Sequence, residues 1–144
     1  MSLFGAYDDQ NIFAKILRGE MAAVKVWEDE VALAFMDLFP QAPGHTLVVP
    51  KRARARTLLD FPTDELGPFM ERVQRVARAV VQGLAADGVT IMQFNGAAGG
   101  QTVFHLHVHV IPRGAGAPLT GHGAARTADV VELEALAARI AAAM

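Results

Sequence analysis

The chain has 144 residues, a formal net charge of −2 and no cysteine. At this length we expect one domain rather than two, and the lack of cysteine excludes disulfides, thiolate catalysis and sulfur-ligated zinc. Because Lys and Arg are not in excess, the composition gives no reason to expect a nucleic-acid partner.

The sequence shows no targeting or membrane-spanning pattern. Residues 1–10 lack a basic segment followed by an apolar run, which argues against a signal peptide. No apolar stretch approaches the roughly 20 residues needed to cross a bilayer. Apolar residues make up 52% of the chain, enough for a sizeable core. We therefore expect a soluble, cytoplasmic protein with no membrane partner.

The first part of the chain predicts a short helix followed by three strands. Apolar residues at helical spacing predict a helix over 9–18, which Gly19 ends. Two β-like runs, 24–28 and 31–36, are separated by two acidic residues and predict a hairpin. A third strand is predicted over 45–49, after a loop rich in Pro and Gly.

The second part predicts a long helix, two strands and a last helix. The long helix spans 63–86, because its apolar residues fall on one face. Strands are expected at 89–94 and 103–111, joined by a glycine-rich loop at 96–100, and the last helix at 128–142. Short connections favour antiparallel pairing over β-α-β winding. The predicted fold is therefore α+β, with an antiparallel five-stranded sheet.

The strand predicted over 103–111 carries His105, His107 and His109 at alternating positions. Alternate side chains of a strand share one face, so we expect three imidazoles in a row, about 7 Å apart. The opposite face is apolar and can pack under a helix. Three polar rings in line need many hydrogen-bond partners, which disfavours a purely structural role for all of them.

Two functional interpretations remain open from these residues alone. Two of the histidines together with His45 could bind a metal, since imidazole is a common zinc ligand. Alternatively, an imidazole nitrogen acts as a nucleophile near pH 7. The loop from Asn95 to Thr102 favours the second interpretation, because the N–H groups of its glycines, Gly100 among them, can approach a phosphate, and Gln101 adds a side-chain donor.

With this histidine run and the loop before it, the sequence resembles the histidine-triad (HIT) family of nucleotide hydrolases and transferases. The run His105-Leu-His107-Val-His109-Val-Ile matches the family signature His-x-His-x-His-x-x with apolar x, and residues 100–104 before it are also family-like. Upstream, residues 34–51 resemble the family's nucleoside-binding hairpin and the strand after it. Residues 12–16 resemble its first helix.

This resemblance covers about residues 11–113 and implies a single HIT domain over 1–144, in which 114–144 form a C-terminal extension with a helix. It implies the HIT-like fold and a homodimer with one continuous sheet. Many relatives have zinc-binding cysteines near the positions of Asn11 and Ala14. The resemblance therefore argues against that structural zinc, and we expect neither a metal nor a cofactor.

The resemblance also implies catalytic roles for four histidines. His107 would attack the α-phosphorus of a nucleotide and form a nucleotidyl-histidine, which water then opens. His105 would help to orient His107, largely through its backbone carbonyl. His109 would donate hydrogen bonds to phosphate oxygens, and His45 would join the polar network behind the triad.

A further set of residues is implied to bind the substrate. Asp37 would accept hydrogen bonds from ribose hydroxyls, and Gln101 and Thr102 would bind a phosphate or the leaving group. Phe94 stands where relatives often have Asn or Gln, which removes one expected ribose contact. The other expected contacts, four of which wall the base, are Ile12, Phe13, Phe35, Leu38, Asn95 and Gly100.

The leading hypothesis is a hydrolase that acts on a nucleoside phosphoramidate, a dinucleoside polyphosphate or a similar conjugate of a purine nucleotide. The alternatives are a His-ligated metalloenzyme and a nucleotide-binding protein with little catalysis. Arg113 directly follows Pro112, where phosphoramidase-like members often have Gly-Gly-Arg, so the sequence does not assign that subgroup. His122 lies beyond the resemblance and is expected to be an exposed loop residue.

Overall fold

The computed structural model describes residues 3–119 and 126–144; His122 lies outside these ranges. Within them the chain forms three α-helices and five β-strands. In chain order these are α1 (Ile12–Leu17), β1 (Lys25–Glu28), β2 (Ala32–Met36), β3 (Thr46–Pro50), α2 (Leu66–Leu84), β4 (Gly88–Met92), β5 (Val108–Arg113) and α3 (Val130–Ala141).

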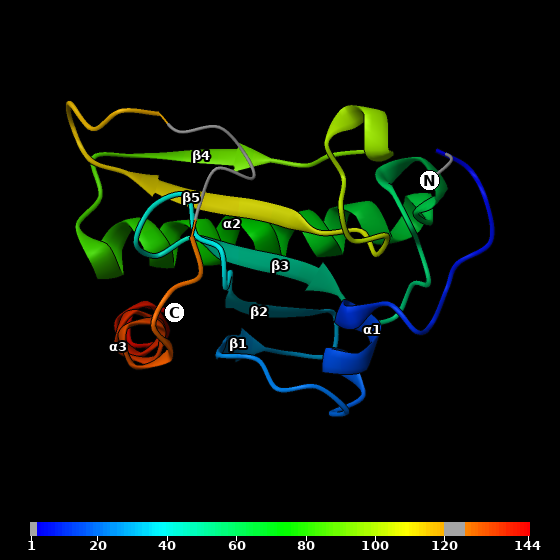
Figure 1. Cartoon of the computed structure of the whole chain (residues 1–144), viewed down its shortest axis with the longest axis horizontal. Helices are drawn as coiled ribbons and strands as arrows, with labels where there is room; N and C mark the ends of the chain where they lie inside the picture. The colour runs from blue at the N-terminus through cyan, green and yellow to red at the C-terminus, as the bar shows by residue number, and fades with distance from the viewer. Residues whose placement is uncertain (1–2, 120–125) are drawn as a thin grey trace.

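The five strands form one antiparallel sheet in the order β1-β2-β3-β5-β4 (Figure 1). The last strand in the sequence, β5, is therefore inserted between β3 and β4, where His109 pairs with Leu47 on one side and Met92 on the other. β4 lies at one edge of the sheet. The predicted antiparallel architecture and the β1–β2 hairpin are confirmed.

Helices cover the two faces of the sheet unequally. The larger core lies between one face and the helices α2 and α3, and includes Ala34, Val48 and Val110. The smaller core lies on the opposite face, where Phe13 of α1 packs over Phe35 and its neighbours. Because both faces are covered, every residue of β2 and of β3 is buried. His109 follows Val108 in β5, so its side chain is on the α1 face.

The start of α1 shows how the local sequence positions this smaller core. Asn11 is the N-cap, and its Oδ1 accepts a hydrogen bond of 2.9 Å from the N–H of Ala14. The helix ends before Gly19, which adopts a φ of 77°. Asn11 and Ala14 thus form a helix cap at the positions where the resemblance leads one to expect cysteines.

The predicted strand over 103–111 is wrong in its first half. β5 begins only at Val108, and residues 103–107, which precede it, are not part of the sheet. Leu106 instead donates its N–H to the carbonyl of Ala55 at 2.9 Å, away from any strand pairing. The alternation of apolar and polar residues continues through this segment, so periodicity could not reveal where the pairing stops.

The other helices and strands agree with the predictions to within a few residues. The long helix is α2, preceded by a 3₁₀ turn at Thr63–Glu65, and the last helix is α3, which packs against α2 and β1. Among the described residues, no helix is both long enough and apolar enough to span a lipid bilayer. The cytoplasmic location expected from the sequence stays a prediction.

Candidate functional site

Four histidines gather on the α1 face of the sheet. His109 lies in β5, His45 directly precedes β3, and His105 and His107 lie in the segment that leads into β5. All four are buried, with between 0% and 6% of their surface exposed. The structure therefore brings together the four predicted catalytic side chains, three of them from outside a regular strand.

The ring of His107 is held in one tautomer. Its Nδ1 lies 2.7 Å from the backbone carbonyl oxygen of His105. A carbonyl oxygen only accepts, so Nδ1 must carry the proton, and in the neutral ring Nε2 then has no proton. The rings of Phe13 and His107 meet in a T-shaped contact, with their centroids 4.9 Å apart. His107 therefore presents the lone pair that a nucleophile needs.

The ring of His105 is held at both nitrogens. Its Nε2 donates to the carbonyl of Pro50 at 3.1 Å, so Nδ1 is the acceptor, and the hydroxyl of Tyr7 donates to it at 2.6 Å. Burial lowers the pKa of His105 to about 4, partly offset by the Pro50 hydrogen bond. The ring is therefore neutral at pH 7.

His45 and His109 form a second defined pair. The backbone N–H of Gln41 donates to Nδ1 of His45 at 3.0 Å, so the proton of His45 is on Nε2. That nitrogen lies 2.9 Å from Nδ1 of His109 and donates to it. The neutral His109 must then carry its own proton on Nε2. The ring centroids of His107 and His109 are 5.0 Å apart, so a ring with an acceptor Nε2 lies beside a ring with a donor Nε2.

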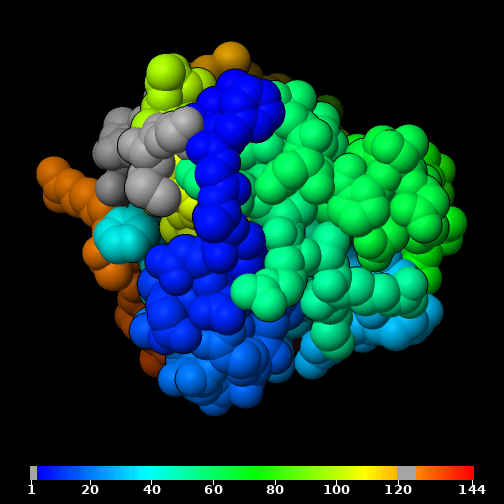
Figure 2. Space-filling view, turned by 90° about the vertical axis from the view of Figure 1, so that its right-hand side faces the viewer, coloured from blue at the N-terminus to red at the C-terminus, as the bar shows by residue number. Residues whose placement is uncertain are grey.

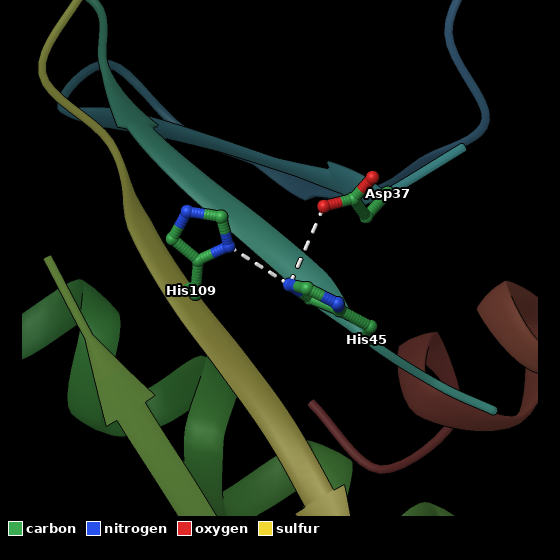
Figure 3. A group of neighbouring side chains, drawn as sticks. All are labelled: Asp37, His45 and His109. Carbon is green, nitrogen blue, oxygen red and sulfur yellow. Dashed lines mark hydrogen bonds and ion pairs between the residues drawn. The ribbon is translucent and has the colours of Figure 1, made fainter. Parts of the chain in front are cut away.

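Asp37 joins the His45–His109 pair, as Figure 3 shows. Its Oδ2 lies 3.4 Å from Nε2 of His45, and its Oδ1 accepts the N–H of Phe39 at 2.8 Å. Asp37 therefore both shapes the turn after β2 and contacts the polar network. The predicted contact with a ribose stays a prediction. In that contact, the oxygens of Asp37 would be shared between the ribose hydroxyls and its present partners, His45 and Phe39.

The side chains of Asp37, His45 and His109 have ligand atoms within 4.8 Å of one another, a spacing that could hold a metal ion. The hydrogen bonds argue against it. A metal on Nε2 of His45 would move the proton of that ring to Nδ1, where it would face the N–H of Gln41. The group also differs from the predicted alternative, because it contains one triad histidine rather than two. The arrangement fits a hydrogen-bond network better than a metal centre.

Gln101 braces the glycine-rich loop. Its side chain is 3% exposed; Oε1 accepts the N–H of Gly96 at 2.8 Å, and Nε2 donates to the carbonyls of Arg56 and Val103 at 2.6 and 3.0 Å. A contact of this amide with phosphate would require these bonds to open, so that role stays a prediction. Thr102, the next residue, is exposed.

Phe94 and Gly100 lie against each other beside His109. The Phe94 ring meets the His109 ring edge-on at 5.3 Å. Gly100 has a φ of 100°, and a Cβ at this position would approach the Phe94 ring to 3.3 Å. A larger residue than Gly is therefore disfavoured at 100 on two grounds. The sequence marks Phe94 only as a lost ribose contact and does not predict its packing against His109.

Asn95 is held by its neighbours. Its Oδ1 accepts from the N–H of Leu58 at 2.9 Å and from the amide of Gln93 at 2.8 Å, and its own amide donates back to Gln93 at 2.8 Å. The structure thus gives Asn95 a role in connecting the loop to residues 57–60. Its predicted contact with substrate stays a prediction.

The four residues predicted to wall a base divide into two kinds. Phe13 and Phe35 are buried and pack edge to face, with ring centroids 5.3 Å apart, in the core beneath the site. Ile12 and Leu38 are each 44% exposed. The exposed pair can contact a base directly, whereas the buried pair belongs to the smaller core beneath the histidines.

Tyr7 is the contact that sequence reasoning missed. It is the only tyrosine of the chain, and 98 positions separate it from His105. No spacing or periodicity in the sequence links the two residues, so only the folded chain shows the pairing.

The fold and the histidine network define a histidine-triad protein, and comparison with known proteins agrees. Residues 18–116 match the sequence profile of the HIT domain. The chain belongs to the histidine triad family.

Individual relatives extend this match. A Hit-like protein from Bartonella henselae, described as involved in cell-cycle regulation, is 50% identical with a TM-score of 0.91, over 97% of this chain and 100% of that one. A zinc-bound histidine triad protein from Mycobacterium smegmatis is 37% identical with a TM-score of 0.82, over 93% of this chain and 92% of that one. Adenylylsulfatase HINT3 from Arabidopsis thaliana is 36% identical over 71% of this chain and 51% of its own length. The family therefore includes a hydrolase.

Proposed function

We propose that the protein is a nucleotide hydrolase in which Nε2 of His107 attacks the α-phosphorus of the substrate. The observation that carries this proposal is the 2.7 Å hydrogen bond from Nδ1 of His107 to the carbonyl of His105. It leaves Nε2 as the unprotonated nitrogen of a neutral imidazole, the form that attacks phosphorus.

The reaction has two displacements. Nε2 of His107 forms a bond to the α-phosphorus, and the bond from phosphorus to the leaving group breaks. The leaving group departs with the electron pair of that bond and takes up a proton from solvent. Water then attacks the nucleotidyl-histidine and loses a proton to solvent. The P–N bond breaks with its electron pair returning to Nε2, and nucleoside monophosphate and neutral His107 are released. Both steps depend mainly on alignment and on donors to the phosphate oxygens.

The neighbouring histidines suit these needs. His109 carries its proton on Nε2, as the chain of hydrogen bonds from Gln41 through His45 requires, so it can donate to a phosphate oxygen. The exposed side chain of Thr102 is a second donor at the end of the glycine-rich loop. Ile12 and Leu38 offer exposed apolar surface to the base. We propose purine nucleoside phosphoramidates, dinucleoside polyphosphates and related conjugates as the substrate class.

The test is a panel of these substrates, with release of nucleoside monophosphate as the readout. Samples quenched at alkaline pH, which preserves P–N bonds, are digested, and the peptide that contains His107 is analysed by mass spectrometry. We expect turnover that a chelator does not affect, and a peptide heavier by one nucleotidyl group. Activity lost to the chelator and restored by zinc would support the metalloenzyme instead. Tight nucleotide binding with neither turnover nor the heavier peptide would support a binding protein.

We also propose that the protein is a homodimer that pairs through β4. β4 pairs with β5 on one side and lies at the sheet edge in Figure 1. Beside it, α2 and β4 line an apolar groove of about 340 Å³, in which Val89 and Ile91 are 37% and 48% exposed. The β4 strand of a second copy, in antiparallel orientation, can pair with the free edge of this β4. By two-fold symmetry each copy then covers Val89 and Ile91 of the other.

Replacing Ile91 by Lys tests this dimer. We expect light scattering to give a mass near 15.4 kDa for the variant and twice that for the unmodified protein, because a charge at the centre of an apolar interface is costly. The matched control is Val131→Lys, since Val131 is 71% exposed on α3. The control should remain dimeric. Equal masses for both variants and the unmodified protein would contradict the proposed interface.

A further inference from the structure

The N-terminal segment, residues 3–11, lies across the molecule next to the histidine site. In Figure 2 this segment crosses the face beside the green segment that follows β3. It also lies outside the part of the chain that matches the family profile, which begins at residue 18. Within it, Tyr7 reaches the buried ring of His105, with its hydroxyl oxygen 2.6 Å from Nδ1.

We propose that Tyr7 is a positioning residue for the site: its hydroxyl holds the ring of His105, and through the backbone carbonyl of His105 it holds the tautomer of His107. Its importance for catalysis rests on the proposed function. The effect on the tautomer of His107 does not, and it can be measured without any substrate.

The Nδ1 atom of His105 needs a hydrogen-bond donor. The Pro50 carbonyl takes the proton on Nε2, so the buried Nδ1 needs a donor, and the Tyr7 hydroxyl supplies it. Burial raises the pKa of Tyr7, so the hydroxyl keeps its proton. A donor on Nδ1 also favours the neutral ring. Without the hydroxyl, His105 would lose one of the two hydrogen bonds that orient its ring.

Tyr7 is itself held in place by its neighbours. The Arg54 guanidinium lies 5.4 Å from the centroid of the Tyr7 ring and pairs with Asp9 at 3.2 Å. Two residues further along, Nη1 of Arg56 donates to the carbonyl of Ala6 at 3.5 Å. These contacts join residues 6–9 to residues 54–56, so the hydroxyl of Tyr7 has a set position against the rest of the site.

The backbone carbonyl of His105 connects the position of His105 to the ring of His107. Residues 103–107 precede β5 and have no strand partner, so sheet pairing does not fix the carbonyl of His105. On either side of His105, the segment is held by the bond from Gln101 to the carbonyl of Val103 and by the bond from Leu106 N–H to Ala55. His105 itself is held by the two bonds of its ring. Loosening this ring therefore loosens the acceptor that keeps the proton of His107 on Nδ1.

Tyr7→Phe is the variant that tests the proposal, because it keeps the ring and removes only the hydroxyl. The ring ¹⁵N shifts of the histidines are measured in the substrate-free protein. We expect one His107 tautomer in the unmodified protein and a mixture of both in the variant. Loss of one supporting hydrogen bond should lower kcat about tenfold while KM changes little. The control is Phe4→Ala, which removes a ring that is 66% exposed in the same segment and should change neither quantity.

The outcomes separate this proposal from the proposed function. If Tyr7→Phe leaves the His107 shifts unchanged and lowers only the melting temperature, Tyr7 is a tether of the N-terminus and the proposal is wrong. If no nucleotide is hydrolysed even by the unmodified protein, the hydrolase proposal fails. The ¹⁵N shifts would still decide the role of Tyr7 in that case.

Discussion

His107→Ala should lower the rate of nucleotide hydrolysis by at least roughly 1,000-fold, because loss of a covalent nucleophile removes the reaction path itself rather than one supporting contact. In the other three histidines of the site, the unprotonated nitrogen accepts a hydrogen bond from Tyr7, Gln41 or His45. The variant should still bind nucleotide, since the ring of His107 supplies no hydrogen-bond donor from Nε2.

His109→Gln is the matched control for this variant. Its amide keeps an N–H donor near the position of the His109 ring, so we expect a fall of only about 10- to 100-fold. The heavier peptide that contains His107 should persist in His109→Gln and be absent from His107→Ala. Undiminished hydrolysis by a clean His107→Ala preparation would refute the proposed mechanism, and the heavier peptide would then have to be sought on another residue.

The second large effect concerns stability at acidic pH. The pKa of His105 is about 4 in the folded protein, below its ordinary value of 6.5. Between these two pH values the unfolded chain binds a proton at His105 that the folded chain does not, so the free energy of unfolding must fall as the pH falls. The full contribution of His105 to the free energy of unfolding is present above pH 6.5 and is lost by about pH 4. The pKa difference corresponds to roughly 3 kcal/mol.

Urea denaturation between pH 4 and pH 7 measures this loss. Native domains have only about 5–15 kcal/mol of stability, so the fall should be easily detected. Carboxylates such as Glu28 and Asp29, whose pKa values hydrogen bonds and ion pairs hold below the ordinary ones, add to the loss at the acidic end. The informative quantity is therefore the difference from His105→Gln, which cannot gain the proton. Equal pH dependence in both proteins would show that His105 is not the cause.

Much of the fold follows from local patterns in the sequence. Residues 66–84 have an apolar stripe at helical spacing, and Gly19 ends α1 through its positive φ. The short connections predict an antiparallel sheet, and the structure has one. These features are predictable because each depends on neighbours only a few positions apart.

The structure brings the predicted catalytic histidines together but gives several of the predicted substrate contacts a structural role. His45, His105, His107 and His109 do converge, although the first half of the predicted histidine strand is not a strand. The amide of Gln101 has its hydrogen bonds inside the loop, and Phe13 and Phe35 pack in the core. Residue types alone could not show this, because a donor that binds phosphate and one that braces a loop are identical in the sequence.

Local patterns in the sequence are enough to predict the family motif of the histidines, the helices and the antiparallel sheet. Which nitrogen of each ring carries its proton is set by tertiary contacts alone. That choice depends on single acceptors and donors from distant segments: the carbonyl of Pro50 and the hydroxyl of Tyr7 for His105, and the N–H of Gln41 for His45. A hydrogen bond requires a definite distance and direction, and between segments far apart in the chain only packing sets them.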